Sequence, residues 1–215
     1  MFTALMQVQW KGTRVAALLA TVLGFATPLL SVQIGASDSV QPAYLVWRMQ
    51  GFGVAYALLA AGVGLAFAIF AWSPDHKGRH VYALALPVNR SGYAAMRLGA
   101  GALFLILPAL GVLAGSLIAV AIAMIPPGLH GYPFALALRF LLASAVAFSI
   151  FFAIAASTPK AAGMILGLIA SVFAVAFILA AASVQYDLLG HAGSFLFSEP
   201  GPLSVFTGRW MLIDA

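Results

Sequence analysis

Residues 51–97 decide the fold of this chain: they read GFGVAYALLAAGVGLAFAIFAW and then SPDHKGRHVYALALPVNRSGYAAMR. The first part, residues 51–72, is uncharged and mostly apolar. As a helix rising about 1.5 Å per residue, it is long enough to cross a hydrocarbon layer of about 30 Å. The second part, residues 73–97, carries four basic residues and one acidic residue. Together the two parts predict a membrane helix followed by a polar loop that a soluble partner can reach.

The composition of the whole chain supports this interpretation. Charged residues make up 7% of the 215 residues and hydrophobic residues 64%, whereas soluble domains carry about 25% charged residues. A soluble chain of this length could not bury so much apolar surface. We therefore expect an integral membrane protein.

Four further stretches have the length and apolarity of membrane helices. With residues 51–72 they make five predicted spans, at 15–34, 51–72, 98–124, 134–157 and 161–184. The third contains Pro108, so we expect it to tilt or kink. The strands of a membrane barrel would appear as alternating segments of about ten residues, and the sequence shows none. It predicts an all-α, polytopic helical membrane protein with one transmembrane domain over residues 1–215.

Residues 1–14 form a distinct amino-terminal segment. Phe2, Leu5, Met6 and Trp10 fall at helical spacing, and polar residues fall largely on another face, which predicts an amphipathic helix along the membrane surface. A simple helical extension of the first span is the other interpretation. The apolar part of that span is longer than the 7–15 residues of a signal peptide, so we expect an uncleaved anchor.

The tail after the fifth span, residues 185–215, is harder to interpret. Residues 185–202 are expected to be a polar external stretch with a turn at Pro200, Gly201 and Pro202. Residues 203–213 are apolar but too short to cross a membrane. Three interpretations are open: an interfacial segment with Trp210 as its anchor, a segment that re-enters between helices, or the start of a sixth span.

Basic residues at the ends of the spans predict the orientation. Three lie on one side, namely Arg48, Arg139 and Arg209. Seven lie on the other, and they are Lys11, Arg14, Lys77, Arg79, Arg90, Arg97 and Lys160. The amino terminus and residues 73–97 are therefore expected in the cytoplasm, with the chain in the plasma membrane, the inner membrane of a bacterium.

Several kinds of chemistry are missing from the sequence. It has no phosphate-binding G-x-x-x-x-G-K-[ST] loop, no cysteine, and no Asp or Glu within the predicted spans. We therefore expect no ATP hydrolysis by this chain, no cofactor of its own, and no ion-driven transport through buried carboxylates. We expect no nucleic-acid partner either. His76 and His80 have the spacing of a metal site, but Lys77 and Arg79 beside them favour a solvated or partner-facing surface.

Arg139 and two glycine pairs each allow two interpretations. Arg139 lies about six residues into the fourth span, where it can contact an anionic substrate, or extend to the headgroups or form a structural pair. Each glycine pair has the four-residue spacing that lets membrane helices approach closely. They are Gly111 with Gly115 and Gly163 with Gly167, and they predict helix packing within the chain or a dimer contact.

One short motif resembles a known family. Residues 84–90, LALPVNR, followed by Ser91, Gly92, Tyr93 and a basic residue at Arg97, are similar to the "lPvsR…y…K" segment after the second span of ABC-2 type transporter permeases. The amphipathic amino-terminal segment and the basic inner loop also fit that family. Members usually have six spans with short re-entrant helices before the sixth, whereas this chain stops after what resembles the re-entrant part.

The resemblance implies a function and a set of partners. It implies a permease subunit of an ATP-driven exporter that pairs with a second membrane subunit, as a homodimer or heterodimer, and is driven by a separate ATPase subunit that holds ATP and Mg. Residues 1–14 would be the interfacial helix beside the coupling surface. The residues expected to contact the ATPase are Asp75, Lys77, Arg79, Leu84, Pro87 and Arg90.

Two other functions are kept beside transport. The first is a non-transporting membrane anchor or assembly protein that recruits a soluble partner through residues 73–97. The second is a membrane-embedded enzyme, which lacks a recognisable set of acid, base or metal ligands within the spans. For transport, a path lined by Phe, Leu, Ala and Ser favours an amphiphile or a lipid-linked molecule over a metal cation.

Overall fold

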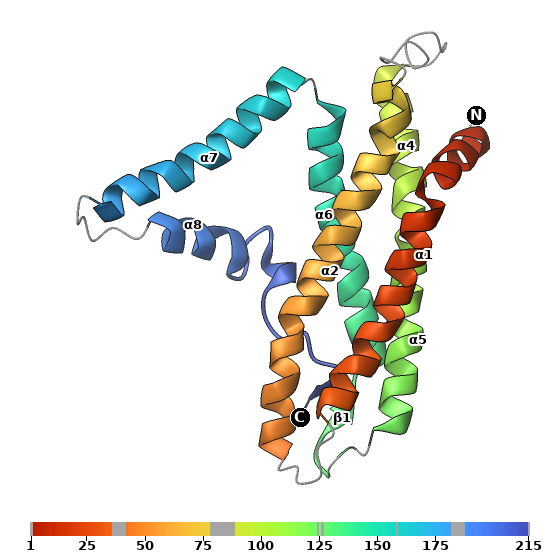
Figure 1. Ribbon diagram of the computed structural model, residues 1–215, viewed down its shortest axis with the longest axis vertical. Coiled ribbons are helices and arrows are strands. Elements are labelled where there is room, and N and C mark those ends of the chain that lie inside the picture. Colours follow the sequence, from red (N-terminus) through yellow and green to blue (C-terminus); the bar gives the residue numbers. More distant parts are fainter. Residues whose placement is uncertain are drawn as a thin grey trace. The chain divides into compact units, whose positions relative to one another are not determined.

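The computed structural model describes residues 2–35, 42–77, 89–123, 125, 127–157, 159–181 and 188–214 (Figure 1). The chain divides into two units, Met1–Phe152 with Arg209–Ala215, and Ala153–Gly208. The elements are α1 (Phe2–Gly35), α2 (Pro42–Lys77), α4 (Arg90–Phe104), α5 (Ile106–Ile122), β1 (His130–Gly131), α6 (Pro133–Ala156), α7 (Pro159–Ala181), α8 (Leu188–Phe197), the 3-10 helix η1 (Ser204–Phe206) and β2 (Ile213–Asp214).

Within the described residues, four helical stretches are long and apolar enough to cross a membrane. They are Leu5–Val32, Gly51–Ser73, Ser91–Ile122 and Pro133–Ala156, and they match the first four predicted spans. The mainly helical fold is thus confirmed. Helix α7 contains a shorter apolar stretch, Gly163–Leu179, so the fifth span stays a prediction.

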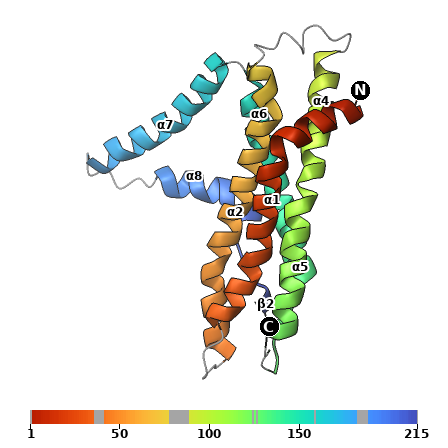
Figure 2. The same ribbon diagram turned by 45° about the vertical axis from the view of Figure 1, so that its right-hand side comes forward.

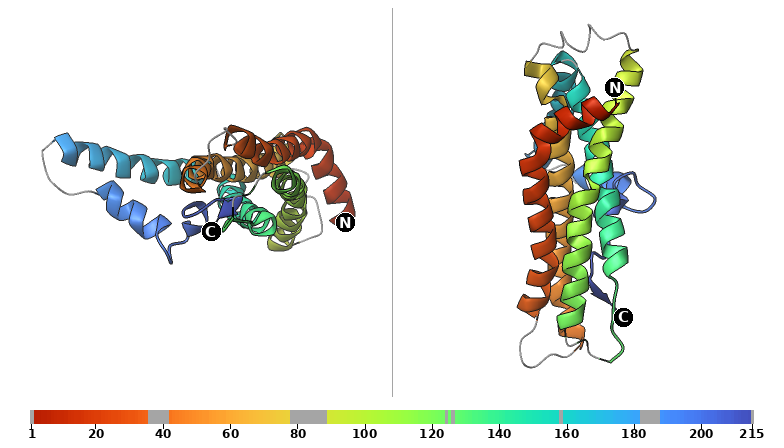
Figure 3. Two further views of the ribbon diagram at one scale, coloured as in Figure 1. Left: turned by 90° about the horizontal axis from the view of Figure 1, so that it is seen from below. Right: turned by 90° about the vertical axis from the view of Figure 1, so that its right-hand side faces the viewer.

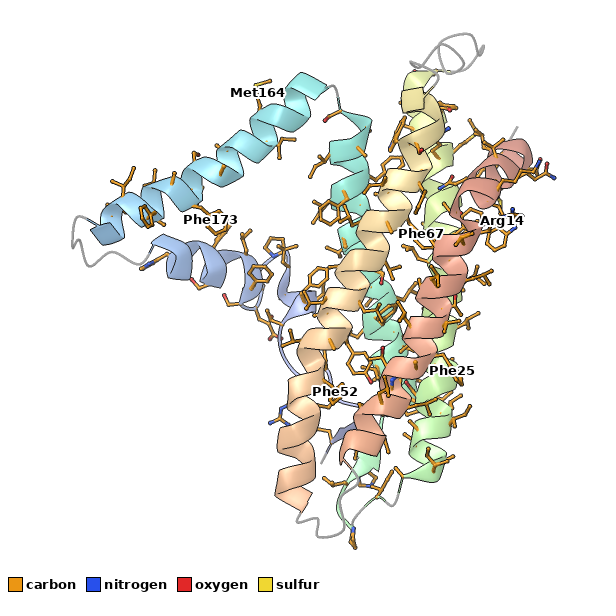
Figure 4. All side chains as sticks on the ribbon, in the orientation of Figure 1. Arg14, Phe25, Phe52, Phe67, Met164 and Phe173 are labelled. Carbon is orange, nitrogen blue, oxygen red and sulfur yellow. The ribbon has the colours of Figure 1, made fainter. Side chains whose placement is uncertain are left out.

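Helix α1 is one continuous helix from Phe2 to Gly35, so the predicted amino-terminal helix and the first span are not separate elements. Its first turns nevertheless lie oblique to the rest, with the change of direction close to Arg14 (Figures 2 and 4). Gly12 lies in this region, and the Thr13 hydroxyl donates to the Gln9 carbonyl oxygen at 2.8 Å. Both features accompany bends in helices.

Ser73, Pro74 and Asp75 follow the second predicted span and predict a break in the helix, and α2 corrects that prediction. The helix continues through Pro74 and ends only at Lys77. Proline fixes φ near the helical value and removes a single hydrogen bond, here the one that the Phe70 carbonyl would accept. Near the end of a helix this loss is tolerated, and α2 therefore extends into the polar segment.

The third predicted span is interrupted, as Pro108 predicts. Helix α4 ends at Phe104 and α5 begins at Ile106, with Leu105 between them. The Leu105 amide donates to the Ala102 carbonyl oxygen at 3.2 Å, a tighter turn than in an α-helix. Pro108 has no amide hydrogen for the Phe104 carbonyl and its ring crowds that carbonyl. The break between α4 and α5 therefore lies in the helical turn that Pro108 disrupts.

The core of unit 1 lies between α1, α2, α4, α5 and α6, which run side by side (Figure 3). Its largest fully buried side chains are aromatic, and they include Tyr56, Phe67, Phe140 and Phe148. Glycines let the backbones approach: a Cβ added to Gly64 of α2 would lie 2.6 Å from the Phe148 amide nitrogen of α6. The bundle is therefore held by close backbone approach around a layer of large rings.

The tail differs from the polar external stretch that its sequence predicts. Residues Leu188–Phe197 form the helix α8, which is largely apolar. The predicted turn is present after it, where the Leu203 amide donates to the Leu196 carbonyl oxygen at 2.8 Å. Leu188, Leu189, Ala192, Phe195 and Leu196 recur at helical spacing, and this is the signal that could have predicted the helix.

Candidate functional site

The polar segment 73–97 begins in the last turn of α2 and ends in α4. Asp75 and Lys77 lie in the last turn of α2, and Arg90 is the first residue of α4. Arg79, Leu84 and Pro87 lie outside the described residues. The Asn89 side chain accepts from the Ser91 amide at 3.4 Å and caps the start of α4. Both helices reach the same end of unit 1 (Figure 2).

Arg97 joins these two helices through the interior. Its side chain is only 4% exposed, and Nη1 donates to the Ala71 carbonyl oxygen of α2. On its own helix, Nε donates to the Tyr93 hydroxyl at 3.0 Å. The sequence predicts Arg97 as one of several basic residues of a solvated loop, and its burial corrects that interpretation.

Aromatic rings surround the Arg97 guanidinium. Its Cζ lies 5.4 Å from the centroid of the Trp72 ring and 5.2 Å from that of Tyr93. The Trp72 ring in turn lies 5.2 Å from Phe152 of α6. These distances permit cation–π attraction, which is strongest for desolvated cations. We call Ala71, Trp72, Tyr93 and Arg97 the Arg97 cluster.

The first turns of α1 pack along α4. Gln9 is buried, and its Nε2 lies 3.0 Å from where a Cβ on Gly101 would be. The Trp10 ring lies 5.4 Å from Phe104. The right-hand view of Figure 3 shows this part of α1 crossing α4. The buried face of residues 2–14 thus contacts α4, the helix in which the polar segment ends.

Arg139 lies at the opposite end of unit 1 and contacts the carboxy-terminal segment Arg209–Asp214. Its Nη1 donates to the Arg209 carbonyl oxygen at 2.8 Å, and its Cζ lies 5.0 Å from the Trp210 ring. The Trp210 ring stacks on Tyr56 with centroids 6.2 Å apart. The structure places Arg139 in a structural contact; its contact with a substrate stays a prediction.

Trp210 therefore corrects the interpretation of this residue as an interfacial anchor. It is 2% exposed, and Met211, Leu212 and Ile213 after it are buried as well. The Tyr132 amide donates to the Leu212 carbonyl oxygen at 2.8 Å, and β2 pairs with β1. The segment packs closely against α2, α6 and β1. Its consecutive apolar side chains are buried, and its extended backbone forms hydrogen bonds with β1 and Tyr132.

The two glycine pairs have different surroundings. A Cβ on Gly111 would lie 2.5 Å from the Thr21 carbonyl oxygen, and Gly115 lies as closely against the backbone of Phe25, which Figure 4 shows on α1 beside α5. These two glycines make helix contacts within the chain. Nothing described lies within 4 Å of a Cβ on Gly163 or Gly167, so the role of that pair stays a prediction.

The metal interpretation finds no support in the described part of the chain, which contains no group of three or more His, Cys, Asp or Glu able to hold a metal ion. His80 lies outside the described residues. The sequence analysis gives no role to Trp72, which directly precedes the polar segment, and it names Tyr93 only as part of the motif, although Tyr93 is four residues before Arg97. That i, i+4 spacing is the signal that could have found the pair.

Comparison with known proteins adds no relative from which a role can be transferred. No protein family, curated protein or solved structure matches this chain. A function for the segment 73–97 must therefore be argued from the contacts described above and from the resemblance at residues 84–97.

Proposed function

We propose that this chain is a membrane subunit of an ABC-2 type exporter. In this proposal a separate ATPase binds residues 73–97 and supplies ATP and Mg²⁺, while the helices of unit 1 form part of the translocation path. A second membrane subunit, identical or different, completes the path. Four helical stretches that can cross a membrane support such a role.

The observation that carries the proposal is the packing of α1 against α4. Residues 2–14 and the segment 73–97 are the two features in which the chain resembles ABC-2 permeases, and they are far apart in the sequence. In the structure Gln9 and Trp10 contact α4 beside Gly101 and Phe104. Residues 2–14 therefore contact the helix in which the segment 73–97 ends, at positions just beyond Arg97, and both features lie toward one end of unit 1, where a single soluble partner can reach them.

The orientation follows from the distribution of charge. Seven of the ten basic residues lie on the side of residues 73–97, which favours a cytoplasmic position for that side and for the amino terminus. The cytoplasm is where ATP is available to a partner ATPase. We therefore place the chain in a plasma membrane, with the Arg139 contact near the outer surface.

The substrate is proposed by class only. The core of the described bundle consists mainly of aromatic and aliphatic side chains, and its buried polar groups include Ser116 and Ser144. No carboxylate lies within the predicted spans, so a metal cation would find no charged oxygen ligand there. A path between helices of this composition suits an amphiphile or a lipid-linked molecule.

The proposal is tested by copurification with the candidate ATPase. Replacing Arg79 and Arg90 by Glu reverses four units of charge in the segment without touching a membrane-crossing stretch. We expect the variant to insert normally and to lose the ATPase in mild detergent, because opposite charges that oriented the contact become like charges. The matched control, Arg48→Glu with Arg209→Glu, makes the same change at the other end and should retain the ATPase.

The alternative function as a membrane anchor predicts another result. A membrane anchor binds a soluble partner through the segment, but reconstituted vesicles then show no ATP-dependent movement of any amphiphile. If the Arg79/Arg90 variant and its Arg48/Arg209 control retain the ATPase equally, residues 73–97 are not the docking surface. Either result contradicts the exporter proposal as stated.

A further inference from the structure

The Arg97 cluster connects the two helices from which the segment 73–97 emerges. Ala71 and Trp72 belong to α2, and Tyr93 and Arg97 belong to α4. The connection lies inside the bundle, because all four residues are buried. A displacement of the chain between α2 and α4 can reach the rest of unit 1 through these two helix ends.

The guanidinium is bound in a specific way. One nitrogen donates to the Ala71 carbonyl oxygen of α2 and another to the Tyr93 hydroxyl, and the planar group lies near the rings of Trp72 and Tyr93. Hydrogen bonds from a charged donor are stronger than neutral ones, and a planar guanidinium stacks on rings as an ammonium cannot. Arginine is thus required at this position, and not only a positive charge.

Packing alone does not account for a buried arginine. An apolar side chain would join α2 to α4 without the cost of desolvating a charge. A hydrogen bond to one backbone carbonyl instead selects one register between the helices. Apolar contacts would allow small shifts along the axis, whereas this bond does not.

We infer that Arg97 is a positioning residue that makes the ends of α2 and α4 move as one body when the segment 73–97 is displaced. The inference rests on the proposed function for the source of the displacement, which is the partner ATPase. Without the Arg97 cluster the two helix ends would separate or slide, and movement at the segment would reach the translocation path only in part.

The first experiment uses the purified chain without a partner. The chain has no cysteine, and Ile69 of α2 and Ala95 of α4 are exposed, so Ile69→Cys with Ala95→Cys accepts two spin labels beside the Arg97 cluster. Distances between the labels are measured by pulsed electron paramagnetic resonance. We expect one narrow distance distribution, a broader one in Arg97→Met, and an intermediate one in Arg97→Lys.

Two further variants make this experiment decisive. Arg139→Met removes an arginine from the other end of unit 1 and should leave the distribution narrow. Trp72→Phe keeps an aromatic ring and removes an indole Nε1 that has no hydrogen-bond partner among the described residues, so it tests the cluster if Arg97→Met does not fold. We expect slight broadening in Trp72→Phe. An unchanged width of the distance distribution in both Arg97→Met and Trp72→Phe would overturn the inference.

The second experiment measures coupling with the ATPase bound in vesicles. We expect Arg97→Met to retain the ATPase and to move roughly 2- to 30-fold less substrate per ATP hydrolysed, the range expected when one coupling contact is lost. Arg97→Lys should recover part of the loss, which a purely structural defect would not show. If the wild-type chain binds no ATPase, the proposed function fails, and the spin-label widths still decide whether Arg97 joins the helices.

Discussion

Gly115 shows how one residue sets the distance between two helices. Its α-carbon lies so close to the Phe25 backbone of α1 that a methyl group would overlap it. Neither backbone can move without disturbing Gly111, which makes the same contact with Thr21 one turn away. The spacing of the two glycines predicts a close contact, but whether with α1 or with another chain depends on tertiary packing.

We expect Gly115→Ala to destabilise the chain by about 1–3 kcal/mol, because added atoms in a packed contact force the helices apart. Gly167→Ala is the matched control, since nothing described lies within 4 Å of its new methyl group. Thermal unfolding in detergent compares the two. Equal unfolding midpoints would show that α1 and α5 do not approach at Gly115.

Arg97 and Arg139 illustrate the limit of sequence reasoning at single residues. Both were recognised as charges near membrane boundaries, from their distance to the apolar stretches. Their partners could not be predicted, because the Ala71 and Arg209 carbonyl oxygens are backbone atoms without a sequence signature. Only the pairing of α2 with α4, and of α6 with the tail, brings these atoms within reach.

At the scale of elements, the apolar stretches predicted four helices well and their ends less well. Helix α2 passes Pro74 because a proline near a helix end costs only one hydrogen bond. The third span is broken at Leu105 as Pro108 predicts. The extended segment Arg209–Asp214 could not be predicted, since its short apolar run is compatible with a surface, a re-entrant segment or a helix start.

The position of that segment is tested by a disulfide. A Cβ on Gly53 of α2 would lie 3.3 Å from the Trp210 Cβ, close to the separation of about 3.5–4.5 Å in disulfides. We expect the pair Gly53→Cys with Trp210→Cys to oxidise readily and to resist a thiol reagent until reduced. Gly62→Cys with Trp210→Cys is the control, since no described atom lies within 4 Å of a Cβ on Gly62. Equal reactivity of the two pairs would contradict the packing of Trp210 on α2.

For the whole molecule, the proposed function joins a membrane bundle to a soluble ATPase. The charge distribution, the motif at residues 84–97 and the packing of α1 on α4 support a contact at one end of unit 1. The membrane character could be predicted from composition, and the helical character from the length of the apolar stretches. The partner could not, because the chain carries only the surface that the partner would bind.

Photocrosslinking in the membrane tests the proposed contact with an ATPase. A photoreactive amino acid is placed at Leu84, and the chain is irradiated in its native membrane before purification and mass spectrometry. We predict one main adduct with a protein that contains a phosphate-binding G-x-x-x-x-G-K-[ST] loop, formed from the cytoplasmic side. The same probe at Phe134, an exposed residue of α6 at the other end of the bundle, should not form it. An adduct at Leu84 only with lipid, or with a protein lacking that loop, would contradict the account.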